Sequence, residues 1–236
     1  MISKQLSPAL FIGIIISLFF LSCEKEEDKE DPVDDNPIVL QSGSFTDSRD
    51  NKAYDWVRIG EQVWMVQNLA YMLNQDGCWA YNDDESISNT YGYLYDWYSL
   101  SDIAPAGWHV PTDPEWSQLI SYLRDNGYHI DDGYNGVAKA LASADGWDVS
   151  DGAGNVGSSD HPELRNKTGF TAIPGGYRNY DGDFVDMGKR AMWWSSTFHP
   201  YDSANSFGRC LQYDGTGNLR LNYPKENAFS IRCVRD

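Results

Sequence analysis

The chain has 236 residues, a formal net charge of −17, 41% hydrophobic and 14% aromatic residues, and 21 glycines. This length suits one domain besides a leader, and the aromatic and glycine content favours short strands and turns over a helical bundle. An acidic surface repels phosphate backbones, so we expect no nucleic-acid partner.

The N-terminus is typical of an exported bacterial lipoprotein. Lys4 precedes an apolar run over residues 9–21, which is shorter than a membrane span and fits the hydrophobic region of a signal peptide. Residues 20–23 resemble a lipobox, with Phe20 where leucine is usual. We therefore predict a signal peptide over residues 1–22 and a Cys23 that carries fatty-acyl chains such as palmitate. The alternative is an ordinary signal peptide with an incidental cysteine.

A charged stretch follows Cys23 directly. Residues 24–32 contain no apolar side chain and cannot offset the entropy cost of ordering, so we predict a disordered tether over residues 23–44. The stretch resembles the acidic segment that sends lipoproteins of Bacteroidetes to the cell surface. We therefore expect an outer-membrane protein exposed at the surface; a solvated spacer without a sorting role is the alternative.

One folded domain is expected over residues 45–236. Its first elements are β-rich runs at 54–59 and 62–66, and the Gly-Glu pair between them predicts a hairpin. The aromatic run 91–98 is expected to pack in the core.

The clearest local signal is a helix that begins after Thr112. Thr112 and Glu115 form a capping box, in which each side chain accepts the other residue's backbone N–H. From Trp116 onward, apolar residues recur at i, i+3, i+4 and i+7, and Gly127 is placed as the C-terminal cap. A shorter helix is predicted over residues 137–144.

The remaining chain reads as strands and turns. Strands are expected at 168–173, 192–196, 207–213, 219–221 and 229–234, with a bend at 174–178 and a hairpin turn at 180–184. Two early helices followed by closely spaced strands predict an α+β domain with a mostly antiparallel sheet.

Six segments, in this order, resemble the Fibrobacter succinogenes major paralogous domain family. They are residues 57–69, 91–97, 107–116, 175–178, 193–197 and 229–234. The resemblance implies a domain of surface and secreted proteins whose activity is unassigned. Many members carry a cysteine pair whose places are held here by Asn89, or its neighbours, and Ala104, so that bridge is missing.

A looser similarity points to the fold. Residues 111–116 and the Gly-Gly-x-Arg at 175–178 are similar to parts of the sulfatase-modifying enzymes, which implies a C-type-lectin-like domain. Those enzymes use two closely spaced cysteines near the C-terminus, whereas Cys210 and Cys233 are far apart in sequence. We instead predict a Cys210–Cys233 disulfide between strands, formed in an oxidising compartment, with Cys78 left free.

No pattern of catalytic or metal-binding residues stands out. The four histidines lack metal-ligand spacing, no Gly-x-Ser-x-Gly elbow occurs, and His109 is expected to be structural. We expect no cofactor, and bound calcium is the alternative. Residues 179–183 look like the start of an EF-hand loop, but Phe184 replaces the required glycine, which favours a turn. Other candidate oxygen ligands are loop residues that solvation explains equally well: Asp145, Asp148, Asp151 and Asn155.

Two aromatic residues in polar loops, Trp147 and Tyr201, are the candidate ligand-binding residues, because exposed rings can stack on sugars. The tryptophans at 108, 116, 193 and 194 are expected inside. The leading hypothesis is a non-catalytic surface module for binding or adhesion, with a glycan or a protein as ligand. The alternatives are an envelope enzyme of unrecognised chemistry on the sulfatase-modifying-enzyme-like fold, and a structural envelope lipoprotein.

Overall fold

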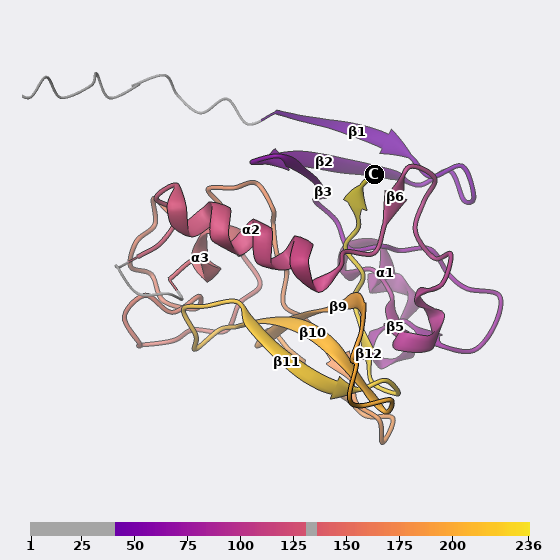
Figure 1. Cartoon of the computed structure of the whole chain (residues 1–236). Coiled ribbons are helices and arrows are strands. Elements are labelled where there is room, and N and C mark those ends of the chain that lie inside the picture. Colours follow the sequence, from indigo (N-terminus) through magenta and orange to yellow (C-terminus); the bar gives the residue numbers. More distant parts are fainter. Residues whose placement is uncertain (1–40, 131–135) are drawn as a thin grey trace, which may run out of the picture. The chain divides into compact units, whose positions relative to one another are not determined.

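A computed structural model describes residues 41–130 and 136–236 (Figure 1). The predicted signal peptide, Cys23 and most of the expected tether lie outside the described residues. Strand β1 (Ser42–Thr46) already begins within the stretch that we expected to be tether, so the fold starts earlier than predicted. In the described part of the chain, no helix has the length and apolar character to cross a membrane.

The first sheet combines the start and the end of the domain. Its order is β1-β2-β3-β13-β6, and every pair is antiparallel. The further strands are β2 (Ala53–Ile59), β3 (Gln62–Met65), β6 (Trp108–His109) and β13 (Val234–Arg235). The predicted hairpin over β2 and β3 is confirmed, with Gly60 at φ 59° in its turn.

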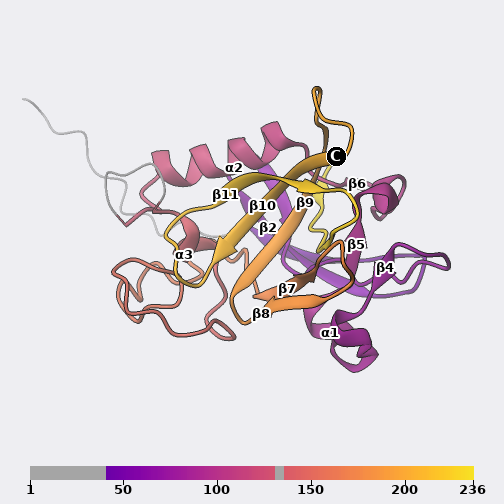
Figure 2. The same cartoon turned by 90° about the horizontal axis from the view of Figure 1, so that it is seen from below.

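The second sheet has the order β11-β10-β9-β7-β12-β5-β4, with β8 paired to β7. All its pairs are antiparallel except β7 with β9, and Figure 2 shows β9, β10 and β11 running side by side. Its strands are β4 (Cys78–Trp79), β5 (Leu94–Asp96), β7 (Gly175–Arg178), β8 (Phe184–Met187), β9 (Arg190–Phe198), β10 (Asn205–Gln212), β11 (Leu219–Pro224) and β12 (Ala228–Phe229).

Helix α2 (Asp113–Asp125) is the long helix that the sequence predicts. Both hydrogen bonds of the capping box are present, and Gly127 follows it at φ 74°. Its apolar side packs in a core cluster with residues of both sheets, such as Trp64 and Trp193. The predicted second helix is α3 (Ala138–Leu141). The other helical elements are α1 (Ser88–Tyr91) and the 3₁₀ turns Tyr81–Asp83, Glu85–Ile87 and Trp97–Leu100.

Aromatic side chains fill much of the core. The four tryptophans expected inside are at most 7% exposed. Within the aromatic run 91–98, Tyr93 and Tyr95 are buried, whereas Tyr98 is 59% exposed because the run leaves β5 before it ends.

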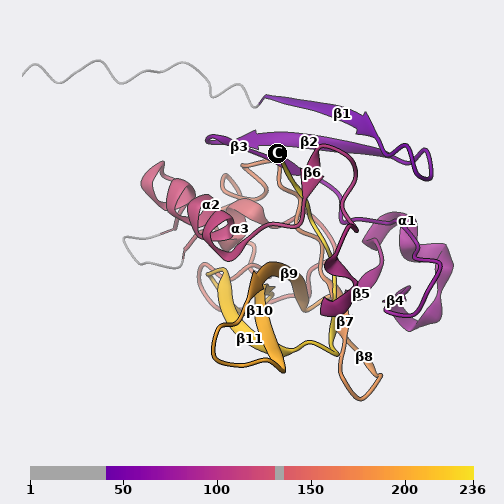
Figure 3. The ribbon, with the colours of Figure 1, turned by 45° about the vertical axis from the view of Figure 1, so that its right-hand side comes forward.

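Three strand and bend predictions are wrong. Residues 168–173 form no strand, because Thr171 has φ 56° and donates its backbone N–H to the Asn166 side chain. The predicted bend at 174–178 instead contains β7, which pairs with β8. The predicted strand at 229–234 is divided between β12 and β13, because this segment leaves the second sheet and enters the first (Figure 3).

The predicted disulfide is also wrong. Cys210 and Cys233 are free thiols in different core clusters, and Cys78 is free too. Strand β9 separates β10, which carries Cys210, from the C-terminal segment, which has reached the other sheet by Cys233. Burial raises the pKa of Cys210 to about 12 and the pKa of Cys78 to about 11, so both thiols stay protonated at neutral pH.

Candidate functional site

A buried polar network lies between the two sheets, around Asn68. The Asn68 Oδ1 accepts hydrogen bonds from the Trp193 indole N–H (3.0 Å) and from Nη2 of Arg232 (2.8 Å). The Asn68 Nδ2 donates to the Tyr91 carbonyl (2.9 Å) and to the Ser230 hydroxyl (3.2 Å). Three segments that are far apart in sequence therefore meet at one amide.

Arg232 completes this network, and none of its hydrogen-bond partners in the described part of the chain is a carboxylate. Its Nη1 donates to the Phe170 carbonyl, its Nη2 also reaches the Thr171 carbonyl, and its Nε donates to Asn68 (3.2 Å). The side chain is 0% exposed and lies 4.4 Å from the centre of the Phe170 ring. Burial lowers the pKa of Arg232 to about 9, which leaves the guanidinium charged at neutral pH. Each side-chain nitrogen of Arg232, the Asn68 Nδ2 and the Trp193 indole N–H donate to acceptors within the protein, so the network has a structural role.

His109 joins the C-terminal end of the domain to α2. Its Nδ1 lies 2.7 Å from an Asp236 carboxylate oxygen, and its Nε2 lies 2.7 Å from Glu115 of the capping box. Burial alone would lower the pKa of His109, but the hydrogen bonds to Asp236 and Glu115 raise it overall. Both ring nitrogens face carboxylates, so neither has a free lone pair to act as a base, and the arrangement is that of a structural residue.

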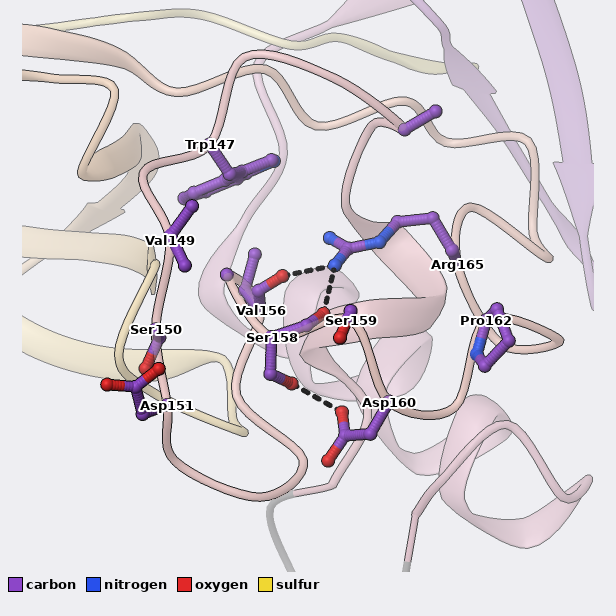
Figure 4. A pocket seen from close by; sticks show the side chains of 12 residues that line it. Trp147, Val149, Ser150, Asp151, Val156, Ser158, Ser159, Asp160, Pro162 and Arg165 are labelled. Atoms are coloured by element: carbon purple, nitrogen blue, oxygen red, sulfur yellow. Dashed lines mark hydrogen bonds between the residues drawn. The ribbon is translucent and has the colours of Figure 1, made fainter.

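A cavity lined by polar, charged and aromatic side chains lies in the loops between α3 and β7. It has a volume of about 430 Å³, and Figure 4 shows Trp147 and Val149 on one wall and Arg165 and Pro162 on the other. The residues that line it are Ala144, Trp147, Val149, Ser150, Asp151, Val156, Gly157, Ser158, Ser159, Asp160, Pro162 and Arg165. We call it the Trp147 cavity.

Trp147 forms a fixed wall of this cavity. Its indole N–H points inward and donates to the Ser143 hydroxyl and the Ala172 carbonyl, each at 3.2 Å. The ring is half-buried and packs against the main core cluster. Val149, two residues further on, is 83% exposed. The ring orientation is therefore set before any ligand arrives.

A buried lysine holds the opposite loop. The Lys139 side chain is 0% exposed, and its ammonium group donates to the Ser158 hydroxyl (2.9 Å), the Asp160 carbonyl (2.6 Å) and the Asp160 carboxylate. The second carboxylate oxygen of Asp160 accepts the Gly154 N–H at 2.6 Å. The hydrogen bonds from Lys139, then Ser158 and Gly154, hold the pKa of Asp160 well below its usual range. Asp160 is therefore ionised, and both of its carboxylate oxygens are used in holding the loop.

Arg165 shapes the remaining wall but is not fully paired. Its Nη2 donates to the carbonyls of Val156 and Ser158, the latter at 3.1 Å. Among the residues that the structure describes, its buried Nη1 has no hydrogen-bond partner, and burial lowers the pKa of the guanidinium. A buried donor without an acceptor costs about 1–3 kcal/mol, whereas every side-chain nitrogen of Arg232 in the network around Asn68 has an acceptor.

The two residues predicted to bind ligand do not share a site. Trp147 lines the cavity, whereas Tyr201 is 94% exposed in the turn between β9 and β10 and is not among the lining residues. Sequence reasoning missed Lys139, Asp160 and Arg165. Lys139 had one usable signal, a single charge in the otherwise apolar run 137–142, but no local pattern marks Arg165.

The segment that resembles an EF-hand is the turn of the β7–β8 hairpin. The backbone N–H of Asn179 donates to the Asp183 carbonyl (2.9 Å), and the N–H of Asp183 donates to the Asn179 side chain (2.8 Å). Over residues 41–130 and 136–236, no group of three or more His, Cys, Asp or Glu side chains is placed to hold a metal ion. The loop acids at 145, 148 and 151 thus do not form such a group.

Comparison with known proteins identifies a family for the domain. A family model described as the Fibrobacter succinogenes major domain matches residues 57–235. No curated protein and no solved structure matches the chain. The matched region includes both the network around Asn68 and the loops of the Trp147 cavity.

Proposed function

The chain belongs to the Fibrobacter succinogenes major domain family, and we propose that its domain is a non-catalytic module that binds glycan in the Trp147 cavity. Sugars present apolar C–H faces and a rim of hydroxyls, and an aromatic wall beside hydroxyl and carboxylate groups matches both. The single observation that carries the proposal is this pre-oriented ring, whose inward N–H bonds keep it in place.

The state of the carboxylates supports binding rather than hydrolysis. Glycoside hydrolysis needs one carboxyl group with a raised pKa as general acid and a second carboxylate across the bond. Two carboxylates line the cavity, Asp151 and Asp160. The pKa of Asp160 is lowered by Lys139, the opposite of what a general acid requires.

We also infer a C-type-lectin-like fold and a lipid anchor. The pairing of β3 with β13, which joins the start of the domain to its end, supports the fold, as does the position of the cavity in the long loops before β7. The lipobox at 20–23 and the acidic tether support an outer-membrane lipoprotein anchored through Cys23 and displayed at the cell surface. Radiolabelled palmitate should enter the wild type and not Cys23→Ala; equal labelling would contradict the anchor.

A glycan array tests the binding function. The full-length chain, kept in mild detergent, is applied to an array of neutral and acidic mono- to hexasaccharides. We expect saturable binding that Trp147→Ala weakens by at least about tenfold, a difference of about 1.4 kcal/mol. Tyr201→Ala removes an exposed ring outside the cavity and serves as the matched control, with unchanged binding. Absence of binding to every glycan, or equal binding by Trp147→Ala, would contradict the proposal, and turnover of a bound glycan would favour an enzyme.

A further inference from the structure

A second cavity lies directly beside the Trp147 cavity. It has a volume of about 380 Å³, and Tyr91, Ile173 and Pro174 give it an apolar wall. Ala144 lines both cavities. Two consecutive residues also divide between the cavities: Arg165 lines the first cavity, and Asn166 lines the second. The two hollows are therefore neighbours along one surface.

Ser143 couples the walls of the two cavities. Its hydroxyl accepts the Trp147 indole N–H in the first cavity and donates to the Asp145 carbonyl (2.8 Å) beside the second. Asp145 and Gly146 line the second cavity, and Trp147 lines the first. Residues 143–147 therefore run along both cavities without a break.

The far wall of the second cavity is held rigidly. The Tyr91 carbonyl accepts a hydrogen bond from Asn68 at 2.9 Å, which ties this wall to the buried network. On another side, the Asn166 side chain binds the Thr171 N–H at 2.8 Å and the Thr171 hydroxyl at 3.0 Å. Both cavities are therefore bounded by groups that are already ordered, so a ligand that spans them pays little to arrange them.

We infer that the two cavities are consecutive subsites of one groove, and that the ligand is an oligosaccharide or polysaccharide chain rather than a single sugar. This inference rests on the proposed glycan-binding function. The Trp147 cavity holds one unit against the indole ring, and the second cavity holds the next unit against Tyr91 and Ile173. A second linked unit enters its subsite at high effective concentration, so affinity should rise steeply when the ligand becomes long enough to reach both.

Calorimetric titration with oligosaccharides of increasing length tests whether the two cavities act as one groove. The probes are β-1,4-linked glucose, xylose, mannose and α-1,4-linked galacturonic acid chains of one to six units, titrated into the full-length protein. We expect affinity for at least one series to rise by about tenfold or more as the second and third units are added, and then to level off. Ile173→Ala should keep the affinity for the single sugar and remove most of the gain with length.

Ala144→Trp provides a second variant, because Ala144 is exposed and a large side chain there fills the junction of the cavities. It should reduce the affinity for longer chains to that for one unit. An affinity that does not change with length, or a length gain that survives both substitutions, would overturn the groove while the glycan-binding function stands. Absence of binding by every series would overturn both.

Discussion

Two arginines show how differently the two polar regions of this domain are built. Arg232, in the network around Asn68, is fully buried and every side-chain nitrogen has an acceptor. Arg165, in the wall of the Trp147 cavity, is half-buried, and its Nη1 has no hydrogen-bond partner within residues 41–130 and 136–236. A fully paired network specifies one packing arrangement, whereas an incompletely paired loop beside open space is suited to meet a ligand.

The two regions also differ in their relation to the segments that resemble the family. Asn68, Trp193 and Arg232 belong to three of the segments that carry the family resemblance, and they contact one another inside the core. The cavity walls instead come from the loop over 144–165, between those segments. We therefore expect relatives to share the network and to differ in this loop.

The largest expected effect is the difference in free energy of unfolding between variants of the two arginines. Arg232→Met leaves the carbonyls of Phe170 and Thr171 without their donor and Asn68 Oδ1 with the Trp193 N–H alone, so the free energy of unfolding should fall by about 3–5 kcal/mol. Arg165→Met removes two bonds to carbonyls together with an unpaired donor, and should cost about 1 kcal/mol. Guanidinium denaturation of both variants measures the difference. Equal losses would remove the distinction between the regions.

A matched pair of tryptophans sharpens the comparison. Trp193→Phe keeps a ring in the core but deletes the N–H that binds Asn68, and should lower the free energy of unfolding by about 1–3 kcal/mol. Trp147→Phe deletes an N–H whose acceptors lie in a half-buried loop, and should cost less, about 0.5–1.5 kcal/mol. Denaturant melts of the two variants in one buffer test this order. The reverse order would mean that the Trp147 hydrogen bonds in the cavity loop stabilise the fold more than the Trp193 hydrogen bond in the core.

Lys139 connects the scaffold to the cavity. Lys139→Met fills the same buried space but removes the ammonium group, so the pKa of Asp160 should rise toward its usual range. In the wild type, the lowered pKa means that Asp160 contributes stability above about pH 4, which is lost as the pH falls through the folded-state pKa. NMR titration of the Asp160 carboxyl carbon in both proteins measures the change. An unchanged pKa would show that Lys139 does not control this loop.

His109 should give the smallest effect, visible only through its pH dependence. Its pKa is raised in the folded state, so the stabilisation is complete below about pH 6.5 and is lost as the pH rises through the folded-state pKa. The stability difference between wild type and His109→Gln should therefore shrink from about pH 5 to about pH 9. A difference that stays constant over this range would mean that protonated His109 does not bind Asp236 and Glu115 in solution.

Local chemistry accounts for what the sequence could predict. The Thr112–Glu115 capping box and the hairpin turn at Gly60 depend on neighbouring residues only, and both are present. The prediction of a Cys210–Cys233 disulfide was wrong because strand order, which depends on long-range packing, places the two thiols in different core clusters.

The candidate site shows the same division. Trp147 could be selected as an aromatic residue in a polar loop, and it does line the cavity. Tyr201 satisfied the same criterion and lies elsewhere, because loop composition does not say which loops meet. Arg165 acquires its role only through the carbonyls that the folded loop brings to it, so no spacing in the sequence could reveal it.

The central claim is that the network around Asn68 maintains the fold while the Trp147 cavity binds glycan. The most direct test measures glycan affinity and the free energy of unfolding in parallel for wild type, Trp147→Ala and Trp193→Phe. We predict that Trp147→Ala loses at least about tenfold in affinity, whereas Trp193→Phe keeps its affinity and loses about 1–3 kcal/mol of stability. Retained affinity in Trp147→Ala, or lost affinity in a folded Trp193→Phe, would contradict this division of roles.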